Sequence, residues 1–166
     1  MGGLVTVGSV MNLMLVVESI AQFSSMFIVR KVTRRGMLLT YALLLICLNS
    51  ILALVDIANV NFAVVGVILM MIFTQECLGI PVMGLYAIEI TNNSALGVIQ
   101  LYNNLIMLAI GYSIPQIVAH LSVPLLFFIC SAVCGLFFAL AFFFVRETSH
   151  LTDKEKKSVY APKKLD

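Results

Sequence analysis

Residues 72–84 read IFTQECLGIPVMG, and in this apolar run two polar side chains, Gln75 and Glu76, stand next to each other. A carboxylate at the centre of a lipid bilayer costs about 2.5–3.5 kcal/mol on insertion scales. A carboxylate inside an apolar segment therefore needs a hydrogen-bonding partner or a functional role. The stretch therefore predicts a membrane-spanning helix with a polar site in its middle.

The composition of the whole chain is that of an integral membrane protein. Of its 166 residues 61% are hydrophobic and 11% are charged, whereas about 25% of the residues in a soluble domain are charged. The ten Lys and Arg residues fall into two clusters, at 30–35 and 146–164. Basic residues that flank apolar stretches are typical of membrane-protein loops. The net charge of +2 therefore does not indicate a nucleic-acid partner.

Five apolar stretches are long enough to cross the hydrocarbon core, which is about 30 Å thick, at about 1.5 Å per helical residue. The sequence thus predicts an all-α membrane protein. Its transmembrane helices are expected at about residues 4–29, 37–55, 62–88, 96–118 and 123–145. Residues 1–145 would form one transmembrane bundle, and residues 146–166 a charged tail without apolar periodicity.

The two basic clusters also predict the orientation. Lys and Arg prefer the cytoplasmic side, and the four spans between the clusters are an even number, so both clusters can lie there. Five spans then place the N-terminus outside and the C-terminal tail in the cytoplasm.

No catalytic or metal-binding pattern is found in the sequence. The four cysteines lie within the apolar spans, and no His or third thiolate accompanies them. Structural metal sites use four such ligands. No nucleophile with a neighbouring base is evident either, so the sequence does not indicate an enzyme, and we expect no metal and no cofactor.

Polar residues recur near the middle of several spans. Glu18 and Glu76 each lie about 17 Å from the expected cytoplasmic end of their span, close to the membrane midplane. Each of the two helices with clustered polar groups presents them on one face, at a spacing of three or four residues. These groups are Glu18, Gln22 and Ser25 in the first span, and Gln100, Asn103 and Asn104 in the fourth, where Met107 continues the same spacing.

Two interpretations of these polar groups remain open. They could join helices by hydrogen bonds, which is a common use of amides in membranes. They could also line a polar cavity, because acidic residues within spans often mark solute or proton paths. A cavity with amides and carboxyls would suit a neutral solute rich in hydroxyl groups. Pro81 and Pro115 predict kinks or local unwinding in the third and fourth spans.

Four stretches together resemble the C-terminal half of the sugar porter family of the major facilitator superfamily, which includes the facilitative glucose transporters. Their order and spacing match helices eight to twelve of the family's twelve, over nearly the whole chain. They are VRKVTRRGMLL at 29–39, ECLGIPVMGLYAIEI at 76–90, ALGVIQLYNNLIMLAIGYSIP at 95–115 and RETSHLTDKE at 146–155.

The resemblance implies a set of sugar-binding residues. Glu76 matches the glutamate that hydrogen-bonds sugar in the family, and Asn103 matches an asparagine of the same pocket. Glu18 occupies a position where the family usually has a pocket asparagine. Asn104 and Gly84 stand where the family has tryptophan, so this chain departs from the family at two aromatic walls of the pocket.

The resemblance also implies a charge network at the cytoplasmic side that holds the two halves of such a transporter together. Arg34, Arg35, Glu89 and Glu147 match its members. Arg30 replaces the acidic residue of the family's loop motif, which reverses one charge of this network.

As a function, the resemblance implies transport of a hexose-type sugar across the plasma membrane, as the C-terminal part of a sugar porter. Family members bind sugar between two six-helix bundles, so we expect the chain to be incomplete on its own. The expected partners are the sugar, the lipid bilayer, and a second copy or an N-terminal six-helix bundle. One alternative is a truncated, non-transporting membrane protein that associates with a full-length transporter and modulates it. Another is a proton-coupled carrier with Glu18 or Glu76 as its proton site.

Overall fold

Every regular element in the described part of the chain is a helix. The computed structural model describes residues 7–58, 60–91, 93–148 and 151. In chain order the elements are α1 (Val7–Lys31), α2 (Arg34–Ile57), α3 (Asn61–Thr74), the short π-helical turn η1 (Gln75–Gly79), α4 (Ile80–Ile90), α5 (Asn93–His120) and α6 (Val123–Phe144).

The prediction of five membrane-spanning helices is confirmed. Five continuous helices are long and apolar enough to cross a bilayer, and one of them combines α3, η1 and α4 over Phe62–Ile90. The loop between the first two helices is shorter than the sequence suggested, because only Val32 and Thr33 separate α1 from α2. Thr33 makes this tight start possible, since its side-chain oxygen accepts a hydrogen bond from the backbone N–H of Gly36. Such an N-cap satisfies a donor that the first helical turn leaves open.

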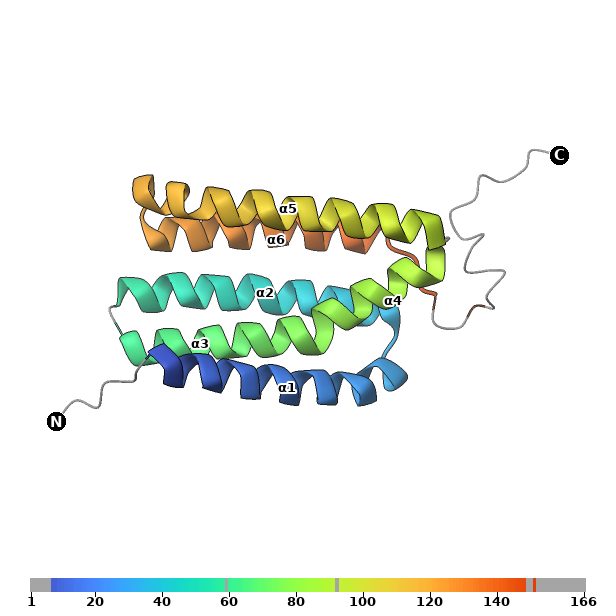
Figure 1. Cartoon of the computed structure of the whole chain (residues 1–166), viewed down its shortest axis with the longest axis horizontal. Coiled ribbons are helices and arrows are strands. Elements are labelled where there is room, and N and C mark those ends of the chain that lie inside the picture. The colour runs from blue at the N-terminus through green and yellow to red at the C-terminus, as the bar shows by residue number, and fades with distance from the viewer. Residues whose placement is uncertain (1–6, 59, 92, 149–150, 152–166) are drawn as a thin grey trace.

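The helices lie lengthwise side by side (Figure 1). Helix α2 packs along α6 and against α3, while α1 packs against α3 and η1. Between α2 and α6, a Ser131 hydroxyl lies 2.9 Å from that of Ser50 and 3.1 Å from the carbonyl oxygen of Ile46. Polar contacts between neighbouring spans of this kind help to hold helices together in lipid. A small apolar core lies near one end of the bundle, formed by Met37, Leu38, Val82 and Ala141.

The third span contains the π-helical turn predicted as a kink at Pro81. Proline has no N–H and its ring clashes with the carbonyl four residues earlier, so it disfavours a regular α-helix at its position. The chain instead widens by one residue just before it, and the N–H of Ile80 donates to the carbonyl of Gln75, five positions back. In Figure 1, α4 leaves the direction of α3 after this turn. Gln75 and Glu76 are the first two residues of the turn.

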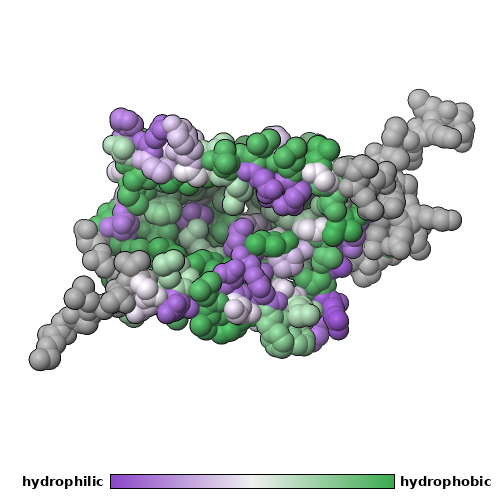
Figure 2. Space-filling view, in the orientation of Figure 1, coloured by the Kyte–Doolittle hydropathy of each residue, from purple (hydrophilic) through white to green (hydrophobic). Residues whose placement is uncertain are grey.

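Helix α5 differs from the other spans in being almost uncovered. Every residue from 97 to 120 is exposed, and the contacts of α5 are mainly with α4, the helix before it. The α-helix continues without interruption through Pro115, so no local unwinding occurs there, and a kink at this proline stays a prediction. Many large hydrophobic side chains are exposed, as expected in lipid, and on the face seen in Figure 2 hydrophilic residues gather around a hollow near the middle.

Candidate solute pocket and charge cluster

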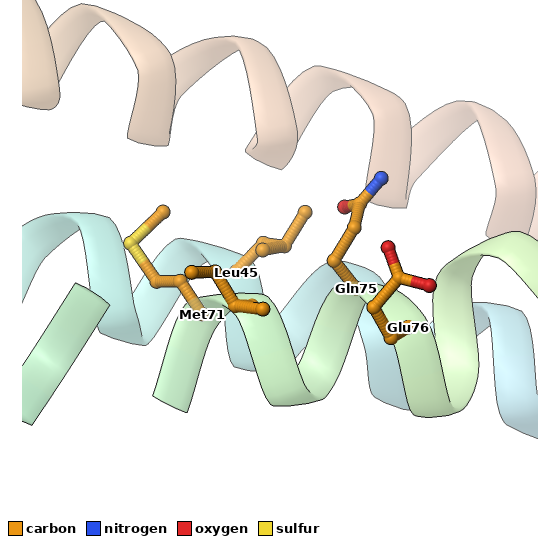
Figure 3. Close-up of a pocket in the computed structure, with 5 residues that line it drawn as sticks. Leu45, Met71, Gln75 and Glu76 are labelled. Carbon is orange, nitrogen blue, oxygen red and sulfur yellow. The ribbon is translucent and has the colours of Figure 1, made fainter. Parts of the chain in front are cut away.

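A pocket opens beside the π-helical turn. It has a volume of about 240 Å³ and is lined by Leu45, Met71, Ile72, Gln75 and Glu76. Figure 3 shows Gln75 and Glu76 extending their polar ends in the same direction, away from the turn. Leu45 and Met71 lie on the apolar side of the same space. This volume is below the range of about 300–1,000 Å³ that is typical of ligand pockets, so the pocket by itself has room for only part of a ligand.

Glu76 is held from the neighbouring helix α1. The side-chain amide of Gln22 donates from Nε2 to Oε2 of Glu76 over 3.1 Å. The other carboxyl oxygen, Oε1, forms no hydrogen bond with a described residue. Glu76 is half-buried, so this oxygen remains open to a solute. The free-energy cost of placing the Glu76 carboxyl group within a membrane span is thus offset in part by the hydrogen bond from Gln22 of α1. The exposure of Oε1 to the open pocket offsets another part.

Gln75 is held from the opposite side, by α2. The Tyr41 hydroxyl donates to Oε1 of Gln75 over 2.5 Å. Tyr41 is itself only 5% exposed, so its position is fixed by packing. The amide nitrogen of Gln75 forms no hydrogen bond with a described residue, and the side chain is exposed. We call Gln22, Tyr41, Gln75 and Glu76 the mid-span cluster.

The other residues expected to bind sugar do not line this pocket. Glu18 lies on α1, one helical turn before Gln22, and is half-buried without a hydrogen bond to a described residue. Asn103 and Asn104 are exposed on α5, and the Gln100 amide donates to Oδ1 of Asn104 over 3.4 Å. The structure therefore brings one of the four residues, Glu76, to the pocket. Whether the other three contact a solute stays a prediction.

The four residues expected to form a charge network meet at the N-terminus of α2. The Glu147 carboxylate, which follows α6, accepts from the backbone N–H groups of Arg34 and Arg35 over 3.1 and 3.0 Å. The Arg34 guanidinium forms an ion pair with Glu89 at 3.5 Å, and both side chains are largely buried, at 17% and 13% exposure. A carboxylate at a helix N-terminus also interacts favourably with the helix dipole.

A threonine that the sequence did not single out completes this arrangement. Thr148 is fully buried, and its hydroxyl donates to Oε2 of Glu89 over 2.6 Å. The Arg35 guanidinium donates to the carbonyl of Phe142 over 2.7 Å and lies 5.4 Å from the centre of its ring. Nε of Arg35 is buried and forms no hydrogen bond with a described residue. We call Arg34, Arg35, Glu89, Glu147 and Thr148 the α2 N-terminal cluster.

The sequence-based site missed two polar residues: Gln75, which lines the pocket, and Tyr41, which donates a hydrogen bond to Gln75. A signal for Gln75 was present, because it directly precedes Glu76 in the apolar run. Tyr41 carried no such signal, since a tyrosine in an apolar helix is most simply read as packing. Within the described residues, no group of three or more His, Cys, Asp or Glu side chains could hold a metal ion.

Comparison with known proteins gives one match. The family model described as "Sugar (and other) transporter" matches residues 3–160, almost the full length of the chain. Neither a curated protein nor a solved structure matches the chain.

Proposed function

The chain belongs to the sugar (and other) transporter family, and on that premise we propose that it takes part in moving a hexose-type sugar across the plasma membrane. The family consists of transporters, and the five apolar helices make the chain an integral, multi-pass membrane protein. Within the proposal, the N-terminus lies outside and the tail in the cytoplasm, since both basic clusters then face the cytoplasm.

The observation that carries this proposal is the pocket at the π-helical turn. It combines two polar groups, Gln75 and Glu76, with apolar walls from Leu45, Met71 and Ile72. A sugar has both hydroxyl groups and apolar C–H faces, so it matches a pocket of this mixed kind. Glu76 offers a free acceptor in this pocket, and its partner Gln22 fixes its direction.

We further propose that other helices complete the site. Asn103 and Asn104 lie on a face of α5 that no described helix covers. Amides exposed to lipid are unfavourable because hydrocarbon offers them no hydrogen bond. A second copy or a further helix bundle that covers α5 would satisfy these amides and close the pocket.

The bare face of α5 also favours one alternative. A chain that does not transport by itself could use α5 to associate with a full-length transporter and modulate it. That function predicts that the chain co-purifies with a transporter and binds no sugar. Proton coupling through Glu18 or Glu76 is a further possibility, and it predicts a solute flux that changes with pH.

A chimera tests the proposed sugar transport and the residues assigned to it. The chain is joined to the first seven helices of a sugar porter, and D-glucose uptake is measured in cells without hexose uptake of their own. We expect uptake that falls at least tenfold with Glu76→Gln and with Asn103→Ala. The matched control is Asn12→Ala, an exposed amide of α1 outside the pocket, which should leave uptake unchanged. Uptake that is unaffected by both site substitutions would remove these residues from the sugar site.

A further inference from the structure

Gln75 and Glu76 present opposite hydrogen-bonding groups to the pocket because a different helix holds each one. Tyr41 occupies the carbonyl oxygen of Gln75, with its hydroxyl as the donor. The amide nitrogen, with its two N–H donors, is the end that remains for the pocket. Gln22 occupies Oε2 of Glu76, and Oε1 remains as an acceptor. The pocket therefore offers a donor and an acceptor from neighbouring residues.

The orientation of a glutamine amide depends on such a partner. The two ends of the amide have nearly the same shape, and only hydrogen bonds determine which way each end points. A tyrosine hydroxyl that donates to Oε1 fixes the amide with its nitrogen facing away from α2. Without this donor, the amide could turn and present an oxygen beside the Glu76 carboxyl. Two acceptors would then stand together in the pocket.

Gly79 provides the space that allows Tyr41 to reach Gln75. A Cβ atom at Gly79 would lie 2.7 Å from both Cε2 and Cζ of the tyrosine ring. Real Cβ contacts are not this close, so any other residue at position 79 would displace the ring. Both the glycine and Tyr41 are buried. The tyrosine and the π-helical turn therefore fit together as one unit, with Gly79 at the contact.

We propose that Tyr41 is a positioning residue for solute selection: it holds the Gln75 amide so that Gln75 donates, and Glu76 accepts, at two neighbouring hydroxyl groups of a sugar. A hydroxyl can both donate and accept, and two adjacent hydroxyls match a donor beside an acceptor. Solutes that lack either hydroxyl leave one of the two pocket groups without a partner. This inference rests on the proposed function, because it concerns the same pocket.

The test uses the full chain in lipid nanodiscs and weak-binding detection by saturation-transfer NMR. The probes are D-glucose and its single-deoxy analogues. For the wild type we expect one or two of the analogues to bind about tenfold or more weakly than D-glucose, since the Gln75 donor or the Glu76 acceptor then loses its partner on the sugar. With Tyr41→Phe, which keeps the ring, this preference should shrink to about threefold or less. Tyr112→Phe is the matched control, because it removes the same hydroxyl from an exposed site on α5.

The pattern across the probes separates positioning from simple support of the fold. If Tyr41 only stabilises the bundle, Tyr41→Phe weakens all the analogues alike and leaves their ratios unchanged. That result would overturn the inference. The double variant, Gln75→Leu with Tyr41→Phe, should not show the wild-type ratios, because the donor of Gln75 itself is then missing.

A second measurement needs no sugar, so the proposed function and the contact can fail separately. The unfolding midpoints of Tyr41→Phe, Gln75→Leu and the double variant form a mutant cycle. We expect the double variant to unfold close to the midpoint of the less stable single variant, since both substitutions remove the same hydrogen bond. Fully additive shifts would mean that Tyr41 does not hold Gln75. Absence of all sugar binding together with a coupled cycle would count against the proposed function while the contact stands.

Discussion

The α2 N-terminal cluster and the mid-span cluster both join helices through polar groups, but they use those groups to different extents. In the α2 N-terminal cluster, both oxygens of Glu147 accept hydrogen bonds, and Glu89 contacts both Arg34 and Thr148. In the mid-span cluster, Gln75 and Glu76 each use one end of the side chain and leave the other end open. A cluster whose carboxylates have their partners within the chain stabilises the fold. A cluster with open groups beside a pocket is suited to a ligand.

The largest effect on stability is expected from a substitution in the α2 N-terminal cluster. Glu147→Ala leaves the first two N–H donors of α2, those of Arg34 and Arg35, without their carboxylate. We expect a loss of about 3 kcal/mol in the free energy of unfolding, since hydrogen bonds to a charged group are lost in a largely buried setting. Denaturant unfolding of the purified chain in detergent measures this loss. Glu147→Gln keeps one acceptor and should lose less, and an equal loss in both variants would mean that the retained oxygen contributes nothing to stability.

The next largest effect is expected from a substitution that disturbs the contact between Gly79 and Tyr41 in the mid-span cluster. Gly79→Ala places a methyl group 2.7 Å from the Tyr41 ring and should cost about 1–3 kcal/mol, as other overpacked sites do. The control is Gly84→Ala, where a Cβ would meet nothing within 4 Å. Thermal unfolding should separate the two variants clearly. Identical midpoints would mean that the tyrosine ring moves aside at little cost.

A binding measurement sharpens the comparison. Glu76→Gln replaces the open acceptor with a group that also donates, and we expect D-glucose binding to fall about tenfold, which corresponds to about 1.4 kcal/mol. The unfolding midpoint should change little, because Gln22 can still bond to the new amide oxygen. The opposite pattern, a large loss of stability with unchanged binding, would place Glu76 among the structural groups instead.

The smallest effect concerns α5. Asn103→Ala should change the stability of the chain by no more than about 0.5 kcal/mol, because its side chain is exposed and surface substitutions rarely do more. In the chimera with further helices, the same substitution should reduce sugar uptake at least tenfold. A large stability loss in the chain alone would show that α5 is covered there, by a second copy. Cross-linking of the purified chain would reveal that copy.

The sequence predicted the helices better than the contacts between them. It predicted five membrane-spanning helices, which the structure contains, and the π-helical turn lies directly before Pro81, where a kink or local unwinding was expected. The resemblance to sugar porters named Arg34, Arg35, Glu89 and Glu147, which the structure brings together. The buried partner Thr148 was not identified, since a threonine that follows a helix has no pattern of its own.

The sequence-based site was less complete. Glu76 lines the pocket, but Glu18 does not, although both were expected at the same depth. Depth follows from counting residues along a helix. Direction depends on how each helix is rotated about its axis and on the extra residue in the π-helical turn, and the polar spacing in a single helix gives neither. Gln75 and Tyr41 therefore became visible as a pair only after α2 and η1 were placed side by side.

The sequence by itself determined that this chain lies in a membrane, and how many times it crosses it. The physical reason is that hydrocarbon leaves few choices: each span needs about twenty apolar residues, with its backbone hydrogen bonds made within the helix. The tertiary structure alone decided which polar groups are satisfied and which remain open to a solute. That outcome depends on hydrogen bonds between residues such as Gln22 and Glu76, which are 54 positions apart and meet only when the helices pack.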